Sequence, residues 1–371
     1  MSATMSRYKG KGYSVLVGMS GGVDSSVTAH LLKEAGYYVE GLGLLLWDAK
    51  NRTNFKSCCS SESVCSAKET AGVIGVKFNV LDARGPFIQH VIEPFVAGYL
   101  SGSTPNPCIL CNRYVKFPLL LEAALNGGFD YVATGHYAGL AHHLPSPAMN
   151  ATKVSLLRGK DDKKDQSYFL YVLGQEVLSR LLLPLGSFSK AATRDRAGKL
   201  NLPAFHRQES QDVCFIDCGG YRKFISDYTG LPSVCEGPIE DVEGRRLGTH
   251  GGLFSYTIGQ RRGIGIAART PLYVVRMDTA TCTLVIGPKE YGLKSEVLVD
   301  NVNWICDEPS LRTAYVRVKL RSTMPPQPAT ITPEAGGGVR IIFGEPQWAP
   351  ATGQSAVFYE DDMVLGGGII V

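Results

Sequence analysis

One short stretch near the N-terminus constrains the fold more than any other part of this 371-residue sequence. Residues 15–26 read V-L-V-G-M-S-G-G-V-D-S-S. The apolar residues Val15 to Val17 suit a buried parallel strand. The adjacent Gly21 and Gly22 allow a tight turn and a close approach to a ligand. A segment with helical spacing begins at Ser25, and its first N–H groups would lie where a phosphate binds well. The stretch predicts a strand, a phosphate-binding turn and a helix, although a capped turn without a ligand has the same pattern.

Strands and helices alternate over the first part of the chain. Strand-like runs lie at residues 38–44, 76–81 and 130–134, and helical periodicity lies at 25–35, 65–74, 86–100, 117–126 and 190–200. This alternation predicts an α/β fold with a doubly wound parallel sheet, whose ligands bind at the carboxyl ends of the strands. We expect residues 101–112 to form a loop, 140–151 an irregular insert, and the stretch up to Leu182 to be helical.

The last third of the chain has a different pattern. Glycine is frequent from Gly237 onward, residues 315–321 alternate between apolar and basic side chains, and residues 355–359 and 363–365 flank a turn. Short alternating strands with frequent turns predict a small β-barrel. We therefore expect an α/β domain over residues 1–205, a small central domain over 206–288 and a C-terminal β-barrel over 289–371.

Composition excludes several classes of protein. Apolar residues make up 44% and charged residues 19% of the chain, as in globular proteins, and no apolar run is long enough to span a bilayer. The polar N-terminus lacks the apolar centre of a signal peptide, so we expect a cytoplasmic protein without a membrane partner. The net charge of +4 permits nucleic-acid binding without arguing for it. Ten cysteines without a secretion signal favour reactive or metal-binding thiols over a disulfide framework.

Two segments place cysteines where they could carry chemistry. Residues 106–112 read N-P-C-I-L-C-N, and residues 210–216 read S-Q-D-V-C-F-I. A C-x-x-C pair could be half a zinc site, a redox pair or part of the ligand set of an iron–sulfur cluster, and chance spacing is a fourth explanation. Cys214 alone could be a small buried residue.

Three further features lie near the expected ligand edge or on the surface. Asp24 would repel phosphates unless it binds Mg²⁺, and it could equally cap a helix. Gly135 and His136 end a strand, where the glycine admits a nucleotide and the histidine could contact a base or simply satisfy its own strand end. Basic pairs such as Arg261-Arg262 and the alternating segment 315–321 could follow a phosphate backbone, although ordinary surface charge explains each of them.

The turn S-G-G-x-D-S resembles the PP-loop of ATP pyrophosphatases, and the wider set of motifs resembles the tRNA-specific 2-thiouridylase family. The similar segments run through nearly the whole chain and are residues 18–25, 106–112, 134–137, 164–170, 210–216, 256–265 and 353–359. The resemblance implies a tRNA-uridine 2-sulfurtransferase. ATP would adenylate the C2 oxygen of the wobble uridine, position 34, in the tRNAs for lysine, glutamate and glutamine. Sulfur would then replace that oxygen, with AMP and pyrophosphate released.

The resemblance also assigns residues to roles. It implies that ATP is bound by Gly18, Met19, Ser20, Gly21, Gly22, Val23, Asp24, Ser25, Leu44 and Gly135, with Mg²⁺ held through ATP at Asp24. It implies that tRNA is contacted by Asn106, Pro107, Cys108, His136, Lys164, Asp165, Gln166, Arg321, Ser322 and Gln354. Cys214 would carry a persulfide, and Cys111 would attack it and close a transient Cys111–Cys214 disulfide. A cysteine desulfurase or a sulfur-relay protein would supply the sulfur.

Cys108 departs from the family pattern, because many members have an aspartate there with an acid/base role. A thiol with a pKa near ~8.5 is not a simple replacement for a carboxylate. Three thiols allow a second scheme, in which Cys108, Cys111 and Cys214 hold a [4Fe–4S] cluster that delivers sulfide. The sequence leaves the persulfide and cluster schemes open.

Two other functions fit parts of the sequence. A PP-loop synthetase that adenylates a small molecule would not need Cys111 and Cys214, and a basic barrel would be unexplained. A non-catalytic RNA-binding protein would have little reason to keep Ser20, Asp24 and Ser25 intact. Pyrophosphate release from ATP separates the three, since it would depend on tRNA, depend on a small acid, or be absent.

Overall fold

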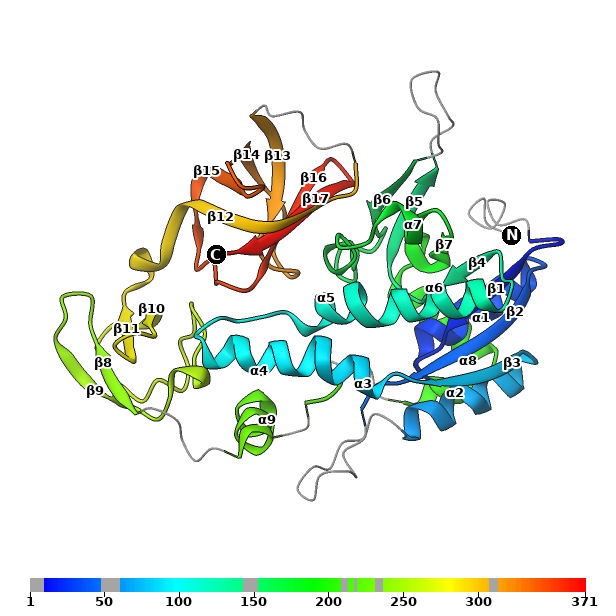
Figure 1. Ribbon diagram of the computed structural model, residues 1–371, viewed down its shortest axis with the longest axis horizontal. Coiled ribbons are helices and arrows are strands. Elements are labelled where there is room, and N and C mark those ends of the chain that lie inside the picture. The colour runs from blue at the N-terminus through cyan, green and yellow to red at the C-terminus, as the bar shows by residue number, and fades with distance from the viewer. Residues whose placement is uncertain are drawn as a thin grey trace.

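The computed structural model describes residues 10–47, 61–142, 153–207, 213–216, 219–230, 236–306 and 313–371. Over these ranges the chain forms a parallel α/β sheet, a small central sheet and a C-terminal barrel (Figure 1). The predicted fold class is therefore confirmed. Residues 210–212 of the second cysteine motif and residues 143–151 of the expected insert lie outside the described residues.

The first sheet carries the PP-loop at its centre. Its strand order is β3-β2-β1-β4-β7, and every pairing in it is parallel. The strands are β1 (Ser14–Gly18), β2 (Tyr38–Leu45), β3 (Lys77–Asp82), β4 (Tyr131–Ala133) and β7 (Leu181–Leu182). Strand β1 has β2 on one side and β4 on the other, so the chain order reverses there. The turn after β1 therefore opens at the crevice where such sheets bind ligands.

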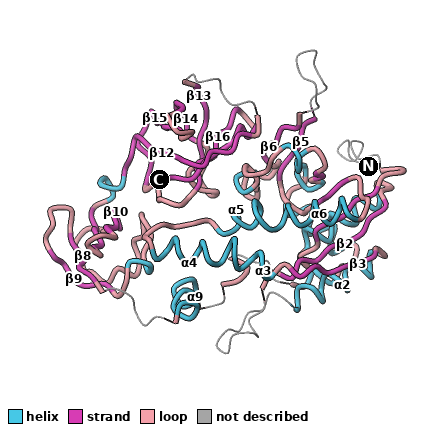
Figure 2. The backbone as a smooth tube through the Cα atoms, viewed as in Figure 1, coloured by secondary structure: helices cyan, strands magenta, loops and turns pink. Residues whose placement is uncertain are grey.

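Helices cover this sheet on both faces (Figure 2). They are α1 (Val23–Glu34), α2 (Ser61–Ile74), α6 (Phe117–Asn126) and α8 (Lys190–Lys199). The apolar residues of β1 explain its central place, since Val15 and Val17 are fully buried. Helix α1 begins directly after Gly22 and carries Asp24 in its first turn, where a carboxylate is favoured by the helix dipole.

The segment between β3 and β4 differs from the prediction. A nearly continuous helical run comprises α3 (Arg84–Phe87), the π-helical η3 (Ile88–Ile92) and α4 (Glu93–Leu100), as expected. The predicted loop, however, contains α5 (Pro107–Cys111), followed by the π-helical η4 (Asn112–Lys116). The cause is local, because the side chain of Asn106 accepts the N–H group of Cys108 at 3.1 Å and Pro107 occupies the first helical position. The prediction of a loop over residues 101–112 was therefore wrong for residues 107–112 and right for residues 101–106.

The segment after β4 also differs. Residues expected to begin an irregular insert form β5 (Ala138–His142), which pairs antiparallel with β6 (Val154–Arg158). The stretch expected to be helical holds only the one-turn η5 (Ser167–Phe169) and α7 (Gln175–Leu178) before strand β7. Short 3-10 turns η6 (Pro184–Ser187) and η7 (Pro203–His206) flank α8. Among the described residues no helix is long and apolar enough to cross a bilayer.

The remaining chain is mostly β, as predicted. Helix α9 (Gly220–Thr229) precedes a central sheet of β8 (Gly237–Glu240), β9 (Arg246–His250), β10 (Tyr273–Asp278) and β11 (Thr283–Gly287), with the turns η8 (Leu253–Ser255) and η9 (Lys289–Gly292). The barrel strands are β12 (Leu293–Trp304), β13 (Ala314–Lys319), β14 (Gln327–Pro333), β15 (Val339–Trp348), β16 (Ser355–Glu360) and β17 (Met363–Ile370). Pairing of β12 with both β15 and β17 closes the barrel.

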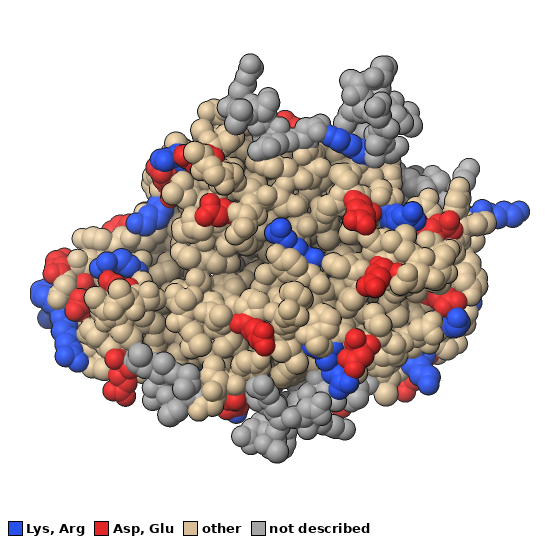
Figure 3. All heavy atoms as spheres, viewed as in Figure 1, with Lys and Arg blue, Asp and Glu red and all other residues tan. Residues whose placement is uncertain are grey.

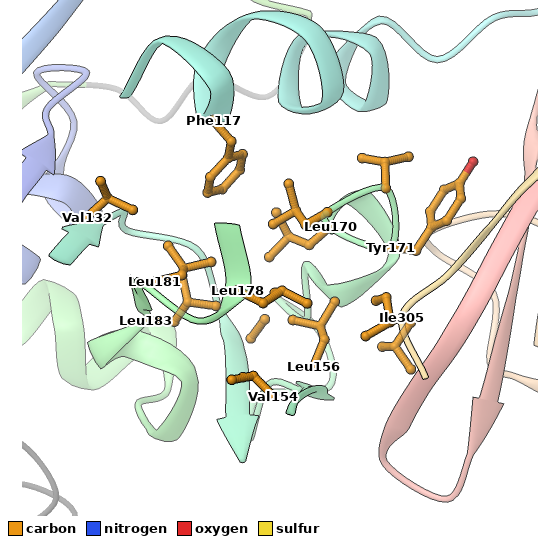
Figure 4. Close-up of a cluster of buried hydrophobic side chains, with 14 of the residues drawn as sticks. Phe117, Val132, Val154, Leu156, Leu170, Tyr171, Leu178, Leu181, Leu183 and Ile305 are labelled. Carbon is orange, nitrogen blue, oxygen red and sulfur yellow. The ribbon is translucent and has the colours of Figure 1, made fainter. Parts of the chain in front are cut away.

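The barrel is joined to the catalytic part by one continuous sheet. Strand β17 pairs with β6, with Val364 opposite Leu156, so the β5–β6 hairpin extends the barrel sheet. A core cluster crosses the same junction and combines Leu156, Leu170 and Leu178 with Ile305 (Figure 4). Val364 belongs to the same cluster. Burying such a side chain contributes roughly 1.5–3 kcal/mol. The two parts therefore share both hydrogen bonds and apolar core.

Candidate active site

The PP-loop lines a cavity of about 750 Å³ together with residues from distant parts of the chain. Of the residues predicted to bind ATP, those on the cavity wall are Met19, Ser20, Gly21, Gly22, Val23, Asp24 and Leu44. Lys164, Gln166 and Cys214 lie on the same wall. The structure thus brings the phosphate-binding turn and the predicted sulfur carrier to one cavity.

Hydrogen bonds inside the loop fix its shape. Gly21 has φ of +75°, and a Cβ atom there would lie 2.3 Å from the carbonyl oxygen of Ser63, so only glycine fits. The hydroxyl of Ser25 accepts the N–H group of Ser20 at 3.2 Å and donates to the carbonyl of Gly22 at 3.2 Å. Ser25 therefore shapes the loop from within, whereas the turn itself faces the cavity.

Asp24 is held by two side chains from later in the sequence. The hydroxyl of Tyr137 donates to Oδ1 at 2.7 Å, and Nζ of Lys190 lies 2.8 Å from both carboxylate oxygens. A single carboxylate beside bound phosphates is the arrangement in which Mg²⁺ is commonly held. The geometry of Asp24 therefore fits the predicted role at the metal, once Lys190 has moved to another anion.

Gly135 does not lie on the cavity wall among the described residues. A Cβ atom on it would lie 2.7 Å from the backbone carbon of Asp24 and 2.7 Å from the nitrogen of Ser25. It therefore lets the end of β4 pack directly on the PP-loop backbone. Gly135 thus positions the loop that is predicted to bind ATP, and its own contact with ATP remains a prediction.

Gly135→Ala is expected to weaken ATP binding about tenfold, because the methyl group must push the Asp24–Ser25 peptide out of place. Gly72→Ala in α2 is the matched control, since a Cβ atom there meets nothing within 4 Å. Isothermal titration of both variants with ATP and Mg²⁺ checks this. Equal affinity in both variants would show that the loop tolerates the displacement.

The three thiols differ in exposure. Cys108 is exposed and Cys111 is buried, and both stand on α5 three residues apart, which places them on neighbouring positions of one helix side. Cys214 is exposed at the cavity, while the adjacent Phe215 packs in the same apolar cluster as Cys111. Residues of both cysteine motifs therefore belong to one apolar cluster.

Burial controls the chemistry of the α5 thiols. It raises the pKa of Cys111, and the positive charge of Lys116 acts in the opposite direction. The protein packed around Cys108 also raises its pKa by disfavouring the charged thiolate, although the side chain is exposed to solvent on one side. Both groups are thus mainly thiols at neutral pH, and Lys116 is the cation that favours their thiolates.

The described cysteines do not form a metal-binding set. Within the described ranges, no group of three His, Cys, Asp or Glu side chains is placed to hold a metal ion. Cys108, Cys111 and Cys214 all belong to those ranges, so they are not gathered as ligands of a cluster in this arrangement.

The side chain of Asp165 is enclosed by its neighbours. Its carboxylate is fully buried, accepts the N–H groups of Gly159 and Ser167 at 3.0 Å each, and lies 3.6 Å from Nζ of Lys319 on β13. The carboxylate therefore stabilises its own turn, and a contact between Asp165 and tRNA would use the backbone. Its neighbours Lys164 and Gln166 line the PP-loop cavity.

His136 lies at the end of β4 and is largely enclosed. Its Nδ1 is 2.8 Å from the hydroxyl of Thr134, and its ring stacks on Phe117 at 5.7 Å between centroids. Burial lowers the pKa of His136 well below its usual value. The ring is therefore neutral, so a contact with tRNA would use hydrogen bonding or stacking rather than charge.

The other residues predicted to contact tRNA are distributed over several elements. Asn106 caps α5, and Pro107 is buried as the first residue of that helix. Arg321 and Gln354 line a second cavity of about 640 Å³ with Arg222 and Arg262. Ser322 lines a third cavity of about 740 Å³ with Lys164 and Arg317. On the face shown in Figure 3, charges of both signs are scattered without a continuous basic stripe.

Sequence reasoning missed four residues at or beside the site. Tyr137 lies in the strand-end motif, which was its only signal, and Lys116 follows the C-x-x-C pair. Lys190 and Arg207 line the PP-loop cavity without any motif around them, and a Cβ atom on Gly21 would lie 3.1 Å from the Arg207 guanidinium.

A parallel sheet with a PP-loop at its switch point, and a thiol on the wall of the same cavity, defines a nucleotide-binding enzyme of the PP-loop class. Comparison with known families agrees with this. Residues 13–218 match the model described as tRNA methyl transferase HUP domain, residues 222–288 the tRNA methyl transferase PRC-barrel domain, and residues 294–370 the aminomethyltransferase beta-barrel domain.

Curated relatives cover nearly the whole chain. The tRNA-specific 2-thiouridylase MnmA of Chloroflexus aggregans is 42% identical over 96% of this chain and 98% of the relative. That of Carboxydothermus hydrogenoformans is 43% identical over 96% of this chain and 97% of the relative. The chain therefore belongs to the tRNA-specific 2-thiouridylase family.

A solved structure shows a weaker similarity. The chain matches the U34-tRNA thiolase NcsA from Methanococcus maripaludis with its [4Fe-4S] cluster at a TM-score of 0.36 and 15% identity, covering 60% of this chain and 66% of that one. At this level the match supports no conclusion about the site.

Proposed function

We propose that the chain catalyses ATP-dependent 2-thiolation of uridine 34 in tRNA. The observation that carries the proposal is that Cys214 lines the same cavity as the PP-loop. A nucleotide-activating turn and an exposed thiol in one cavity suit a reaction in which ATP activates an acceptor and a thiol delivers sulfur. The family-model descriptions name a methyl transferase, but methyl transfer would leave Cys214 and the PP-loop without a joint role.

The activation step removes the difficulty of expelling an oxide from the pyrimidine ring. The C2 oxygen attacks the α-phosphorus of ATP, and pyrophosphate leaves. The C2–O bond then breaks with AMP as the leaving group. The PP-loop N–H groups would hold the phosphates, and Asp24 would supply the carboxylate for Mg²⁺, which would neutralise charge on them.

Sulfur delivery uses the two cysteine motifs. Cys214 carries the donated sulfur as a persulfide, and the Cys111 thiolate attacks Cys214 Sγ and releases sulfide. Sulfide adds to C2 and AMP departs, while a Cys111–Cys214 disulfide remains that two electrons from an external thiol reductant reopen. The shared cluster around Cys111 and Phe215 supports this pairing, and Lys116 favours the attacking thiolate.

We propose the persulfide scheme, and a [4Fe–4S] cluster held by Cys108, Cys111 and Cys214 remains the alternative. The tRNAs for lysine, glutamate and glutamine remain our predicted substrates, and a cysteine desulfurase or relay protein the predicted donor. Cytoplasmic localisation and the domain limits at residues 205 and 288 also remain predictions.

Reconstitution with ATP, Mg²⁺, a persulfide donor and tRNA tests the proposal. We expect AMP and pyrophosphate release with tRNA for lysine and none with a transcript that has cytidine at position 34, with 2-thiouridine detected by mass spectrometry of the digested tRNA. Pyrophosphate release that depends on a small acid would instead indicate a synthetase. Iron analysis of anaerobically purified, active protein distinguishes the cluster scheme.

A further inference from the structure

Lys190 occupies a defined position in the PP-loop cavity that no sequence motif marks. It is the first residue of α8, where Ser189 caps the helix by accepting the N–H group of Ala192 at 3.2 Å. Its own N–H group donates to Asp161 at 2.9 Å. The side chain is only 15% exposed, and Nζ lies 2.8 Å from both oxygens of Asp24. Backbone and side chain are both fixed, so the amine is aimed at the PP-loop.

The partner of Lys190 is Asp24, the carboxylate that would also bind Mg²⁺ in the proposed function. A carboxylate in close contact with an ammonium group binds a divalent cation more weakly, because the two cations repel each other. When Mg²⁺ and ATP enter the cavity, Lys190 must therefore exchange Asp24 for another anion. The phosphates of ATP are the anions that arrive with the metal.

The surroundings support that exchange. Lys164 and Arg207 line the same cavity, so the amine joins a wall that already presents positive charge to an anion. The hydroxyl of Tyr137 donates to Asp24 Oδ1 and keeps the carboxylate oriented when Lys190 leaves. Nζ of Lys190 lies 5.8 Å from the centre of the Tyr137 ring. The face of an aromatic ring attracts a cation, so Tyr137 would stabilise the amine while it moves from Asp24 to the phosphates.

We propose that Lys190 is a substrate-binding residue that transfers from Asp24 to the phosphates of ATP, and that it holds the pyrophosphate that leaves. The identity of the leaving group rests on the proposed function, whereas binding of the phosphates does not. While the cavity is empty, Lys190 neutralises the charge of Asp24. Binding of Mg²⁺ to Asp24 then releases Lys190.

Lys190→Met tests the proposal by equilibrium binding without tRNA. We expect binding of inorganic pyrophosphate with Mg²⁺ to weaken about 10- to 100-fold, because a charge-assisted contact is lost. Binding of Mg²⁺ alone should tighten, since the metal no longer competes with an amine for Asp24. Lys199→Met on the same helix is the matched control, because Lys199 is exposed and pairs with Asp195. Isothermal titration gives both affinities.

Two results would overturn the proposal. One is unchanged pyrophosphate affinity in Lys190→Met, and the other is an equal loss in Lys199→Met. Circular dichroism and a thermal melt establish that each variant is folded. If Lys190→Met is not folded, Lys190→Gln is measured instead, with the same roughly 10- to 100-fold loss of pyrophosphate affinity expected and an unchanged affinity refuting the proposal. Failure of the wild-type protein to thiolate tRNA would refute the proposed function and leave these binding results standing.

Discussion

Cys214→Ser is expected to abolish 2-thiouridine formation while leaving the affinities for ATP and tRNA within about twofold of wild type. Serine keeps the size of the side chain and its place on the cavity wall, but a hydroxyl cannot carry a persulfide. Formation of 2-thiouridine is measured by mass spectrometry of digested tRNA, and both affinities by titration. Full thiolation by this variant would remove Cys214 from the reaction.

Two companion variants make the result specific. Cys65→Ser changes another exposed thiol, on α2, which does not line the cavity among the described residues, and it should react as wild type. Cys111→Ser should stop turnover at a different stage, with an extra sulfur atom retained on Cys214 after exposure to the donor. Intact-mass measurement detects it. Absence of that added sulfur in Cys111→Ser would argue against the order of steps in the proposed mechanism.

Val364→Asp is expected to lower the free energy of unfolding by about 4 kcal/mol or more, because it buries a carboxylate without a partner in the core shared by barrel and catalytic part. Val364 is fully buried and lies opposite Leu156 across the β6–β17 pairing. We expect reduced soluble yield, a lower unfolding midpoint in urea and loss of stabilisation by ATP. Loss of the stabilisation by ATP would show that the barrel supports the fold of the catalytic part.

Leu298→Asp provides the matched control within the same barrel. Leu298 is exposed on β12 and lies opposite Arg340 on β15, so a carboxylate there stays in water beside a positive charge. We expect a change within about 0.5 kcal/mol. A destabilisation by Val364→Asp no larger than that of Leu298→Asp would contradict the shared core.

The elements that the sequence predicted well are those with strong local signals. Val15 to Val17 and the glycines after them predicted the central strand and the phosphate-binding turn. The barrel was predicted from alternating apolar and polar side chains, as in the segment that forms β13. The C-x-x-C pair was misplaced in a loop, because a five-residue helix has too little periodicity to be recognised, although Asn106 and Pro107 are start signals.

Other features depend on contacts between distant residues and leave no local pattern. Lys190 contacts Asp24, and the two residues are separated in the sequence by more than half of the catalytic part. Neither the residues next to Lys190 nor their pattern distinguishes it from a surface lysine. The pairing of β6 with β17 likewise joins strands far apart in the sequence. Asp165 is a further example, since nothing in its polar motif predicts that Gly159, Ser167 and Lys319 enclose its side chain.

The sheet shared by β6 and β17 makes the folding of the barrel and of the catalytic part interdependent. Strand β6 is synthesised before β13 and β17. Until those strands exist, the edge of β6 that pairs with β17 has no partner, and Lys319 is not present beside Asp165. The segment around Asp165 can therefore reach its final form only after the barrel strands have been made, so folding of this part of the catalytic unit has to wait for the barrel.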